Sequence, residues 1–166
     1  MTKRIMIWAV IIIAITVTAY NVFSRFLRTD EQKIRAAIMD CASALESGGS
    51  LRITYALQAN LSDDYRHVGE LVPVSKDLAT GHILHVASEY QDFEVKIDSF
   101  KTTIDGDEAT VMLAGRITAA PKDKPDQRTE VLTSGGHNRC EVRLRKVRGQ
   151  WEIFQSQRLE GGPAQD

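Results

Sequence analysis

Two adjacent carboxylates followed by a phenol, Asp63, Asp64 and Tyr65, are the residues in this sequence most suited to proton transfer. Burial in an apolar pocket would raise the pKa of a carboxylate toward neutrality, where it can act as a general base. These residues also follow the predicted end of a helix, a position in which aspartate commonly forms a solvated turn. Asp64 and Tyr65 are therefore weak catalytic candidates, and a surface turn is the alternative interpretation.

Three candidate metal ligands, His82, His85 and Glu89, lie at positions i, i+3 and i+7 of a predicted helix. They form one row on its surface, and two imidazoles with a carboxylate can bind a divalent cation. The row runs beside the apolar stripe of the helix, not within it. A solvated surface with an ion pair between His85 and Glu89 explains the pattern equally well, so we predict neither a metal site nor a cofactor.

The last predicted strand carries two glutamines, Gln155 and Gln157, on the face expected to point inward. A turn at Arg148-Gly149 would place Val142 opposite Gln155 and Cys140 opposite Gln157. Buried amides need hydrogen-bond partners, which bound water, the backbone or the polar end of a ligand can supply. The predicted pocket is otherwise apolar, and its expected lining consists of Val95, Ile97, Phe100, Leu113, Cys140, Val142, Gln155 and Gln157.

The two cysteines, Cys41 and Cys140, fall on the core-facing sides of a predicted helix and a predicted strand. Outside the cytoplasm, two such thiols can form a disulfide. Two buried thiols that never meet are the alternative, because the sequence does not give the distance between them.

A long β-hairpin over residues 93–119 is the element expected to position the pocket side chains. Asp105-Gly106 is a two-residue turn signal, which predicts Phe100 opposite Val111. The apolar residues occupy odd positions up to Ile97 and even positions from Phe100 onward. One β-bulge near Asp98-Ser99 would return both sets to the same face. A bulged hairpin is strongly curved, and its concave face can hold a helix or a ligand.

Three helices are predicted before this hairpin, and their apolar faces must pack on the sheet. A capping box formed by Thr29 and Gln32 begins the first helix, and Gly48-Gly49 ends it. Ser50 is expected to cap the second helix, which stops before residues 61–65. A brief strand over residues 67–72 and a third helix over residues 76–90 follow.

This order of elements, together with a Gly-x-Trp-x-Ile sequence formed by Gly149, Trp151 and Ile153, resembles the nuclear transport factor 2-like superfamily. That superfamily has a cystatin-like α+β barrel fold and includes SnoaL-like polyketide cyclases and ketosteroid isomerases. The resemblance extends from Asp30 to about Leu159. It implies an α+β fold in which three helices pack on a strongly curved antiparallel sheet to form a cone-shaped barrel, with a pocket between helices and sheet.

Enzymes of this superfamily place an acid in the pocket as general base, often beside a histidine or a tyrosine. Asp63, Asp64 and Tyr65 are the nearest match in this chain, but the inward strand positions predicted here are apolar. The catalytic pairs of those enzymes therefore cannot be transferred to this chain, and the resemblance implies no particular activity.

Residues 5–24, IMIWAVIIIAITVTAYNVFS, are twenty consecutive uncharged residues. As a helix they would extend ~30 Å, the thickness of the hydrocarbon core of a bilayer. We predict a transmembrane anchor over residues 1–28, with a cleaved signal peptide as the alternative because Val17-Thr18-Ala19 fits a cleavage site. The domain over residues 29–160 is large enough to be translocated, so we expect a single-pass membrane protein with an extracytoplasmic domain. Residues 161–166 are predicted to be a disordered tail.

The formal net charge of the 166-residue chain is −1, but the first 27 residues carry only basic charges, on Lys3, Arg4 and Arg25. The remainder has 18 basic and 22 acidic residues, a net charge of −4, which argues against nucleic acid as a partner. The expected partners are the lipid bilayer, through residues 5–24, and a small hydrophobic ligand or a protein. A homodimer is also open, because one face of the sheet is expected to be exposed.

Two classes of function are consistent with these features. The first is a membrane-tethered extracytoplasmic binding or assembly module with a small hydrophobic pocket. Such a protein resembles assembly components of type IV secretion systems and accessory proteins of actinobacterial lipid import. The second is a small lyase, isomerase or cyclase of the SnoaL-like type acting on a hydrophobic substrate, with Asp64 and Tyr65 as its candidates. The lack of acids on the predicted inner face favours the first class.

Overall fold

The computed structural model describes residues 29–68, 73–131 and 138–159. The predicted membrane span over residues 5–24 and the predicted tail over residues 161–166 lie outside this part of the chain. Among the described residues, no helix is both long and apolar enough to cross a bilayer. The helices and strands are α2 (Asp30–Glu46), α3 (Ser50–Asn60), β1 (Leu61–Val68), β2 (Val74–Ser75), α4 (Lys76–Glu89), β3 (Tyr90–Asp105), β4 (Glu108–Pro121), β5 (Thr129–Glu130), β6 (Asn138–Val147) and β7 (Gln150–Leu159).

The helix α2 begins and ends where the sequence predicts. The backbone N–H of Gln32 donates to Thr29 Oγ1, and the backbone N–H of Thr29 donates to Gln32 Oε1, which completes the capping box. Gly48, with φ +66°, lies just beyond the C-terminal end. The helix α3 departs from the prediction in one detail, because its N-cap is Gly49 and not Ser50, and no side chain caps it.

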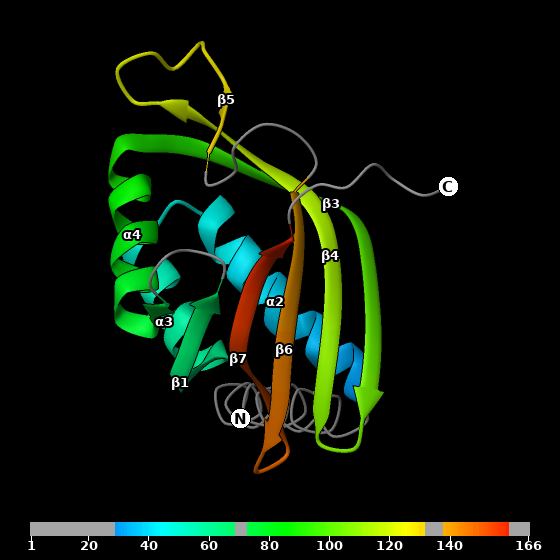
Figure 1. Cartoon of the computed structure of the whole chain (residues 1–166). Helices are drawn as coiled ribbons and strands as arrows, with labels where there is room; N and C mark the ends of the chain where they lie inside the picture. Colours follow the sequence, from blue (N-terminus) through cyan, green and yellow to red (C-terminus); the bar gives the residue numbers. More distant parts are fainter. Residues whose placement is uncertain (1–28, 69–72, 132–137, 160–166) are drawn as a thin grey trace, which may run out of the picture.

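Seven strands form one sheet in the order β2-β1-β7-β6-β4-β3, and β5 pairs with β4 beyond the end of β6. Neighbouring strands are antiparallel except β1 and β7, which are parallel. The sheet is therefore mixed, and the prediction of a purely antiparallel sheet is wrong. The sheet curves around α2, while α3 and α4 lie beside its β1 edge (Figure 1). The α+β arrangement of three helices on a curved sheet agrees with the prediction.

The strand β1 starts at Leu61, directly after α3, and not at residue 67 as predicted. The polar run that suggested a turn is extended instead. Its carboxylates find partners on the surface, since Lys76 Nζ donates to Asp63 Oδ1 at 3.1 Å and the guanidinium of Arg145 donates to Asp64. Because of these contacts, acidic residues that the sequence pattern predicts in a turn can lie in a strand.

The hairpin of β3 and β4 contains the predicted bulge. The pairing shifts between Ile97 and Ser99, so that Asp98 is the extra residue. Gly115 lies opposite Ile97, and a Cβ atom on this glycine would come within 2.4 Å of the Lys96 carbonyl oxygen. The close approach of the two strands at the bulge therefore requires glycine at position 115.

The turn of this hairpin is Gly106-Asp107, one residue later than predicted. Gly106 has φ +59°, which suits the first position of a primed two-residue loop. Phe100 consequently lies opposite Leu113 and not opposite Val111. A register change of two residues keeps every side chain on its face, so the predicted concave face is preserved.

The final hairpin turns at Arg148-Gly149, as predicted, but β7 contains a bulge at Phe154 that the sequence did not reveal. The pairs beyond the bulge are Arg143 with Gln155, Val142 with Ser156, Glu141 with Gln157 and Cys140 with Arg158. Because Val142 is buried, Ser156 takes the inward position and its two neighbours face outward. The predicted inward orientation of Gln155 and Gln157 is therefore wrong.

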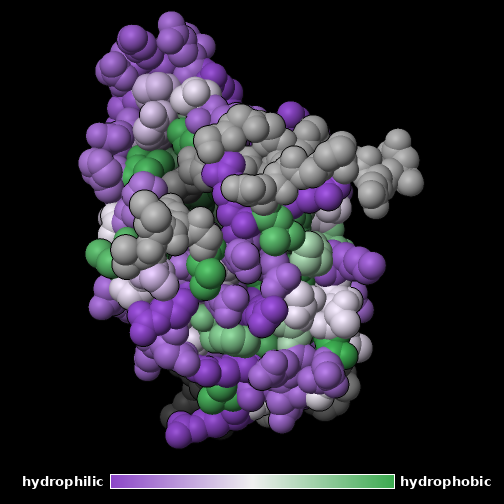
Figure 2. Space-filling view, viewed as in Figure 1, coloured by the Kyte–Doolittle hydropathy of each residue, from purple (hydrophilic) through white to green (hydrophobic). Residues whose placement is uncertain are grey.

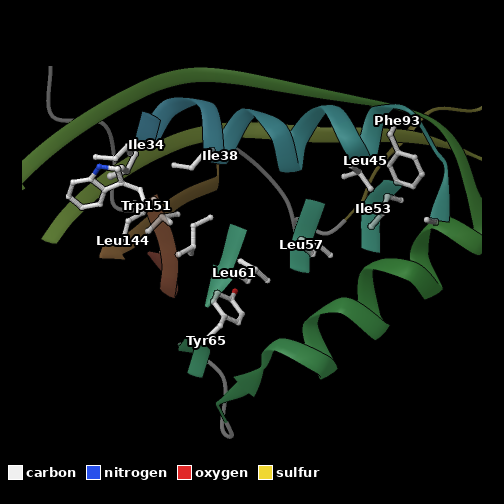
Figure 3. Close-up of a cluster of buried hydrophobic side chains, with 14 of the residues drawn as sticks. Ile34, Ile38, Leu45, Ile53, Leu57, Leu61, Tyr65, Phe93, Leu144 and Trp151 are labelled. Carbon is white, nitrogen blue, oxygen red and sulfur yellow. The ribbon is translucent and has the colours of Figure 1, made fainter. Parts of the chain in front are cut away.

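The core lies between α2, α3 and the concave face of the sheet (Figure 3). Its most deeply buried aliphatic side chains come from both layers: Ile34, Ile53, Val111 and Leu144. Each such side chain contributes roughly 1.5–3 kcal/mol by its removal from water. The opposite face of the sheet, seen in Figure 2, is mostly hydrophilic, with hydrophobic residues scattered across it.

Candidate functional site

A hydrogen-bonded cluster of Tyr65, His67 and Ser156 lies where β1 runs beside β7. Ser156 Oγ is 2.6 Å from Tyr65 Oη and 2.7 Å from His67 Nδ1. His67 pairs with Ser156 across the parallel strands, and Tyr65 precedes His67 by two residues on the same face. The side chain of Tyr65 is buried close to Leu61 (Figure 3), whereas His67 and Ser156 are half-buried. The cluster thus forms a polar border to the apolar core.

One order of the protons in this cluster gives both hydroxyl donors, Tyr65 and Ser156, an acceptor. In this order the Tyr65 hydroxyl donates to Ser156 Oγ, and the Ser156 hydroxyl donates to His67 Nδ1, so the imidazole carries its proton on Nε2. In the reverse order, His67 Nδ1–H donates to Ser156, which donates to Tyr65, and the buried phenol proton loses its acceptor. Leaving a buried donor unpaired costs about 1–3 kcal/mol, so the first order is favoured. His67 Nε2–H then remains available to another acceptor.

The groups around the cluster are held in their neutral forms. Burial raises the pKa of Tyr65, a shift that the hydrogen bond with Ser156 partly offsets. Burial also raises the pKa of Cys140, and raises that of Cys41 to about 12. The sequence left open whether Cys41 and Cys140 form a disulfide or remain separate thiols. In the structure both cysteines are free. Tyr65 is therefore a proton donor at neutral pH, and neither thiol is an activated nucleophile.

Six of the eight residues predicted to line a pocket occupy the concave side of the sheet. Val142 is buried, Ile97 is half-buried, and the remaining four are partly buried against the core: Val95, Phe100, Leu113 and Cys140. The Arg35 guanidinium of α2 covers the Phe100 ring, with its carbon 4.7 Å from the ring centroid. Gln155 and Gln157 lie on the outer face, and Ser156 replaces them as the inward polar residue of β7.

The described surface has a large hollow and a small one, both away from the concave face of the sheet. The larger, of about 920 Å³, is a groove between the outer side of α2, the end of α3 and the β6–β7 turn, and it is lined by residues such as Met39, Arg52 and Trp151. The smaller, of about 190 Å³, lies on the β3–β4 hairpin. None of the eight predicted pocket residues borders either hollow.

The catalytic candidate Asp64 does not share the interior with Tyr65. Its side chain is 60% exposed, and its carboxylate accepts hydrogen bonds from both terminal nitrogens of Arg145 and from the Ser62 hydroxyl. The hydrogen bonds from Arg145, and then that from Ser62, lower the pKa of Asp64. A buried general base requires the opposite shift, so the geometry does not support the predicted role of Asp64.

The row of candidate metal ligands on α4 lies at the surface. His82 is exposed, and His85 Nε2 lies 3.8 Å from Glu89 Oε1, with both of these side chains more than half exposed. Within the described ranges, no three His, Cys, Asp or Glu side chains are grouped closely enough to hold a metal ion.

Sequence reasoning missed two members of the cluster, His67 and Ser156. A signal for His67 existed, because a strand over Leu61–Val68 places Tyr65 and His67 on one face. No comparable signal marks Ser156, since its inward position depends on the bulge at Phe154.

The sequence matches no protein-family model and no curated protein. Solved structures are similar over most of the chain. One is a nuclear transport factor 2-like protein of unknown function from Pseudomonas putida, 18% identical, with a TM-score of 0.57 over 80% of this chain and 87% of that chain. A nuclear transport factor 2-like superfamily protein from Salmonella enterica is 13% identical, with a TM-score of 0.60 over 81% and 91%. A protein of unknown function with a cystatin-like fold from Nostoc punctiforme is 14% identical, with a TM-score of 0.56 over 78% and 89%. Similarity of this degree shows the fold alone.

Proposed function

We propose that this domain, which has the nuclear transport factor 2-like α+β fold, is a membrane-tethered extracytoplasmic binding module for a small, mainly hydrophobic ligand. The observation that carries the proposal is the cluster of Tyr65, Ser156 and His67 at the border of the apolar core. In the favoured order of protons, His67 Nε2–H is free to donate to one oxygen of a ligand. The apolar core that the cluster borders would contact the apolar part of the ligand.

The distribution of acids supports binding without proton abstraction. No Asp or Glu side chain is buried in the part of the chain that the structure describes. General-base catalysis by a carboxylate requires such a group within reach of the substrate. The interior instead offers hydrocarbon surface and hydrogen-bond donors, which suit recognition of a ligand with a single polar end.

Nile red, an apolar fluorophore that carries a carbonyl oxygen, tests this proposal. We expect the full chain in detergent to bind Nile red saturably, and His67→Phe to weaken binding by ~1–3 kcal/mol because the carbonyl loses its donor. Gln155→Leu is the matched control, since this residue lies on the outer face of the same pair of strands and its replacement should leave the dissociation constant unchanged. Equal effects of both substitutions would contradict the proposal.

A second function, that of a small isomerase or lyase, is favoured by one observation. His67 is an imidazole on the inner face, and transfer of its proton from Nε2 to Nδ1 would leave the Nε2 lone pair free to accept a proton from a substrate. Exchange of the α-protons of cyclohexanone in D₂O, followed by NMR, tests for such a base. Exchange that the wild-type chain accelerates over buffer, and that His67→Gln abolishes, would replace the binding module with an enzyme.

A further inference from the structure

The small pocket on the β3–β4 hairpin is lined by three cations and one carboxylate. Lys96 and Arg116 come from the two strands, Arg128 from the loop that precedes β5, and Glu94 and Thr118 complete the lining. Lys96 and Arg116 are exposed on the outer face of the sheet, opposite in direction to the half-buried Val95 and Ile117. The pocket is therefore separate from the interior cluster.

The pairing of the strands places two like charges directly opposite each other. Lys96 and Arg116 are Cα partners in the ladder, and such a pair destabilises a sheet. Among the described residues, neither side chain has a carboxylate partner.

The third cation is held in place by its neighbours. Arg128 Nη2 donates to the Asp92 carbonyl oxygen at 2.7 Å and lies 3.4 Å from Glu94 Oε2. These contacts fix the guanidinium beside the pair and leave Glu94 as the carboxylate that an incoming anion would meet. Three cations against one carboxylate leave the pocket with a positive charge.

The geometry points to a binding site for a phosphate-type anion in this pocket. A group with three oxygens can accept hydrogen bonds from Lys96, Arg116 and Arg128 together, and its charge removes the repulsion within the cross-strand pair. A volume of about 190 Å³ suits such a group more than a whole ligand.

The position of the pocket favours a soluble source of the anion over a lipid headgroup. Arg116 lies eight residues along β4 from Glu108, roughly 25 Å at the rise of a strand, and the first residue of α2 lies toward the Glu108 end of the sheet (Figure 1). If the proposed anchor precedes α2, the bilayer faces that end and the pocket faces away from it. The phosphate or sulfate group of a soluble molecule can reach this position. The preference for a soluble anion over a lipid headgroup rests on the proposed membrane anchor. The binding site itself does not.

Titration of the full chain in detergent with inorganic phosphate, at constant ionic strength, tests the site by calorimetry. We expect saturable binding that Arg116→Gln weakens about tenfold or more, the effect of losing one charge-assisted hydrogen bond. Lys101→Gln is the matched control, because this lysine lies on the same face of β3, opposite Met112 and outside the pocket. It should change the dissociation constant less than twofold. Absence of saturable binding, or equal effects of the two substitutions, would overturn the proposal.

A second variant separates binding from stability. Lys96→Glu replaces the repulsive pair with an attractive one, so it should raise the midpoint of thermal unfolding at low salt while phosphate binding is lost. A lower midpoint, or unchanged phosphate binding, would contradict the proposed role of the pair.

Vesicles of phosphatidylcholine with and without phosphatidic acid test whether the anion is soluble or part of a lipid. Binding that depends on both phosphatidic acid and Arg116 would overturn the choice of a soluble anion.

Discussion

Asp30, the first residue of α2, connects the start of the domain with its last hairpin. Its carboxylate accepts a hydrogen bond of 2.9 Å from Lys146 Nζ and one of 3.1 Å from Trp151 Nε1. The hydrogen bond from Lys146, followed by that from Trp151, lowers the pKa of Asp30. The buried indole thereby gains an acceptor at the surface, and the side chain of one residue links two elements that are far apart in the sequence.

Asp30→Asn is expected to lower the free energy of unfolding by about 1 kcal/mol near neutral pH, because the charge-assisted bond to Lys146 is lost. The pKa of Asp30 is lower in the folded than in the unfolded state. Its charge therefore stabilises the fold above the unfolded pKa, and this contribution disappears as the pH falls through the folded pKa. Urea denaturation at about pH 7 and about pH 3 should show the wild type and the variant converging in acid. A difference that persists in acid would contradict this, and Asp123→Asn, in an exposed loop, is the control.

The hydrogen-bond partners of the interior polar residues could not be predicted from the sequence. The sequence indicates Asp64 and Tyr65, two adjacent residues, as weak catalytic candidates on one site. Successive residues of a strand point to opposite faces of the sheet. The side chains of Asp64 and Tyr65 therefore lie on different sides of β1. The actual partner of Tyr65, Ser156, is 91 residues away, and only the parallel pairing of β1 and β7 brings it close.

Glycine at position 115 is predicted to control the curvature of the β3–β4 hairpin. In Gly115→Ala, the new Cβ would lie 2.4 Å from the Lys96 carbonyl oxygen, so the strands must separate at the bulge. We expect a loss of about 1–3 kcal/mol, the usual cost of overpacking. Gly81→Ala is the matched control, because nothing lies within 4 Å of its new Cβ in α4. It should stabilise the helix by about 0.5–1 kcal/mol. Chemical denaturation of the two variants should give changes of opposite sign, and a neutral Gly115→Ala would contradict the prediction.

The bulges at Asp98 and Phe154 show which irregularities of an element can be predicted. In β3 the apolar residues change from odd to even positions between Ile97 and Phe100, and this break of phase revealed the extra residue. In β7 the inward residue after the bulge is Ser156, a polar residue, so no break of phase is visible after Ile153. The bulge at Asp98 was therefore readable because inward hydrophobic residues lie on both sides of it, and the bulge at Phe154 was not because a polar residue takes the inward position after it.

At the scale of the whole molecule, the predicted topology places the domain outside the cytoplasm. Lys124 lies in the exposed loop between β4 and β5, at the end of the sheet remote from α2's first residue (Figure 1). Lys124→Cys should therefore react with a membrane-impermeant maleimide in intact cells. The wild-type chain is the control, because Cys41 and Cys140 are partly buried thiols of raised pKa that react slowly. Labelling that requires permeabilised cells would reverse the topology.

The parallel contact of β1 with β7 has a consequence for the order in which the protein matures. Leu61 pairs with Ile153, and Asp30 bonds to Trp151, so early and late parts of the chain depend on each other. During synthesis, β1 and Asp30 must wait for β7 to emerge, and such non-local closure is slow. The waiting chain exposes apolar surface to aggregation and proteolysis. A ribosome that stalls before Ser156 would therefore release a chain in which Tyr65 and His67 lack their shared hydrogen-bond partner.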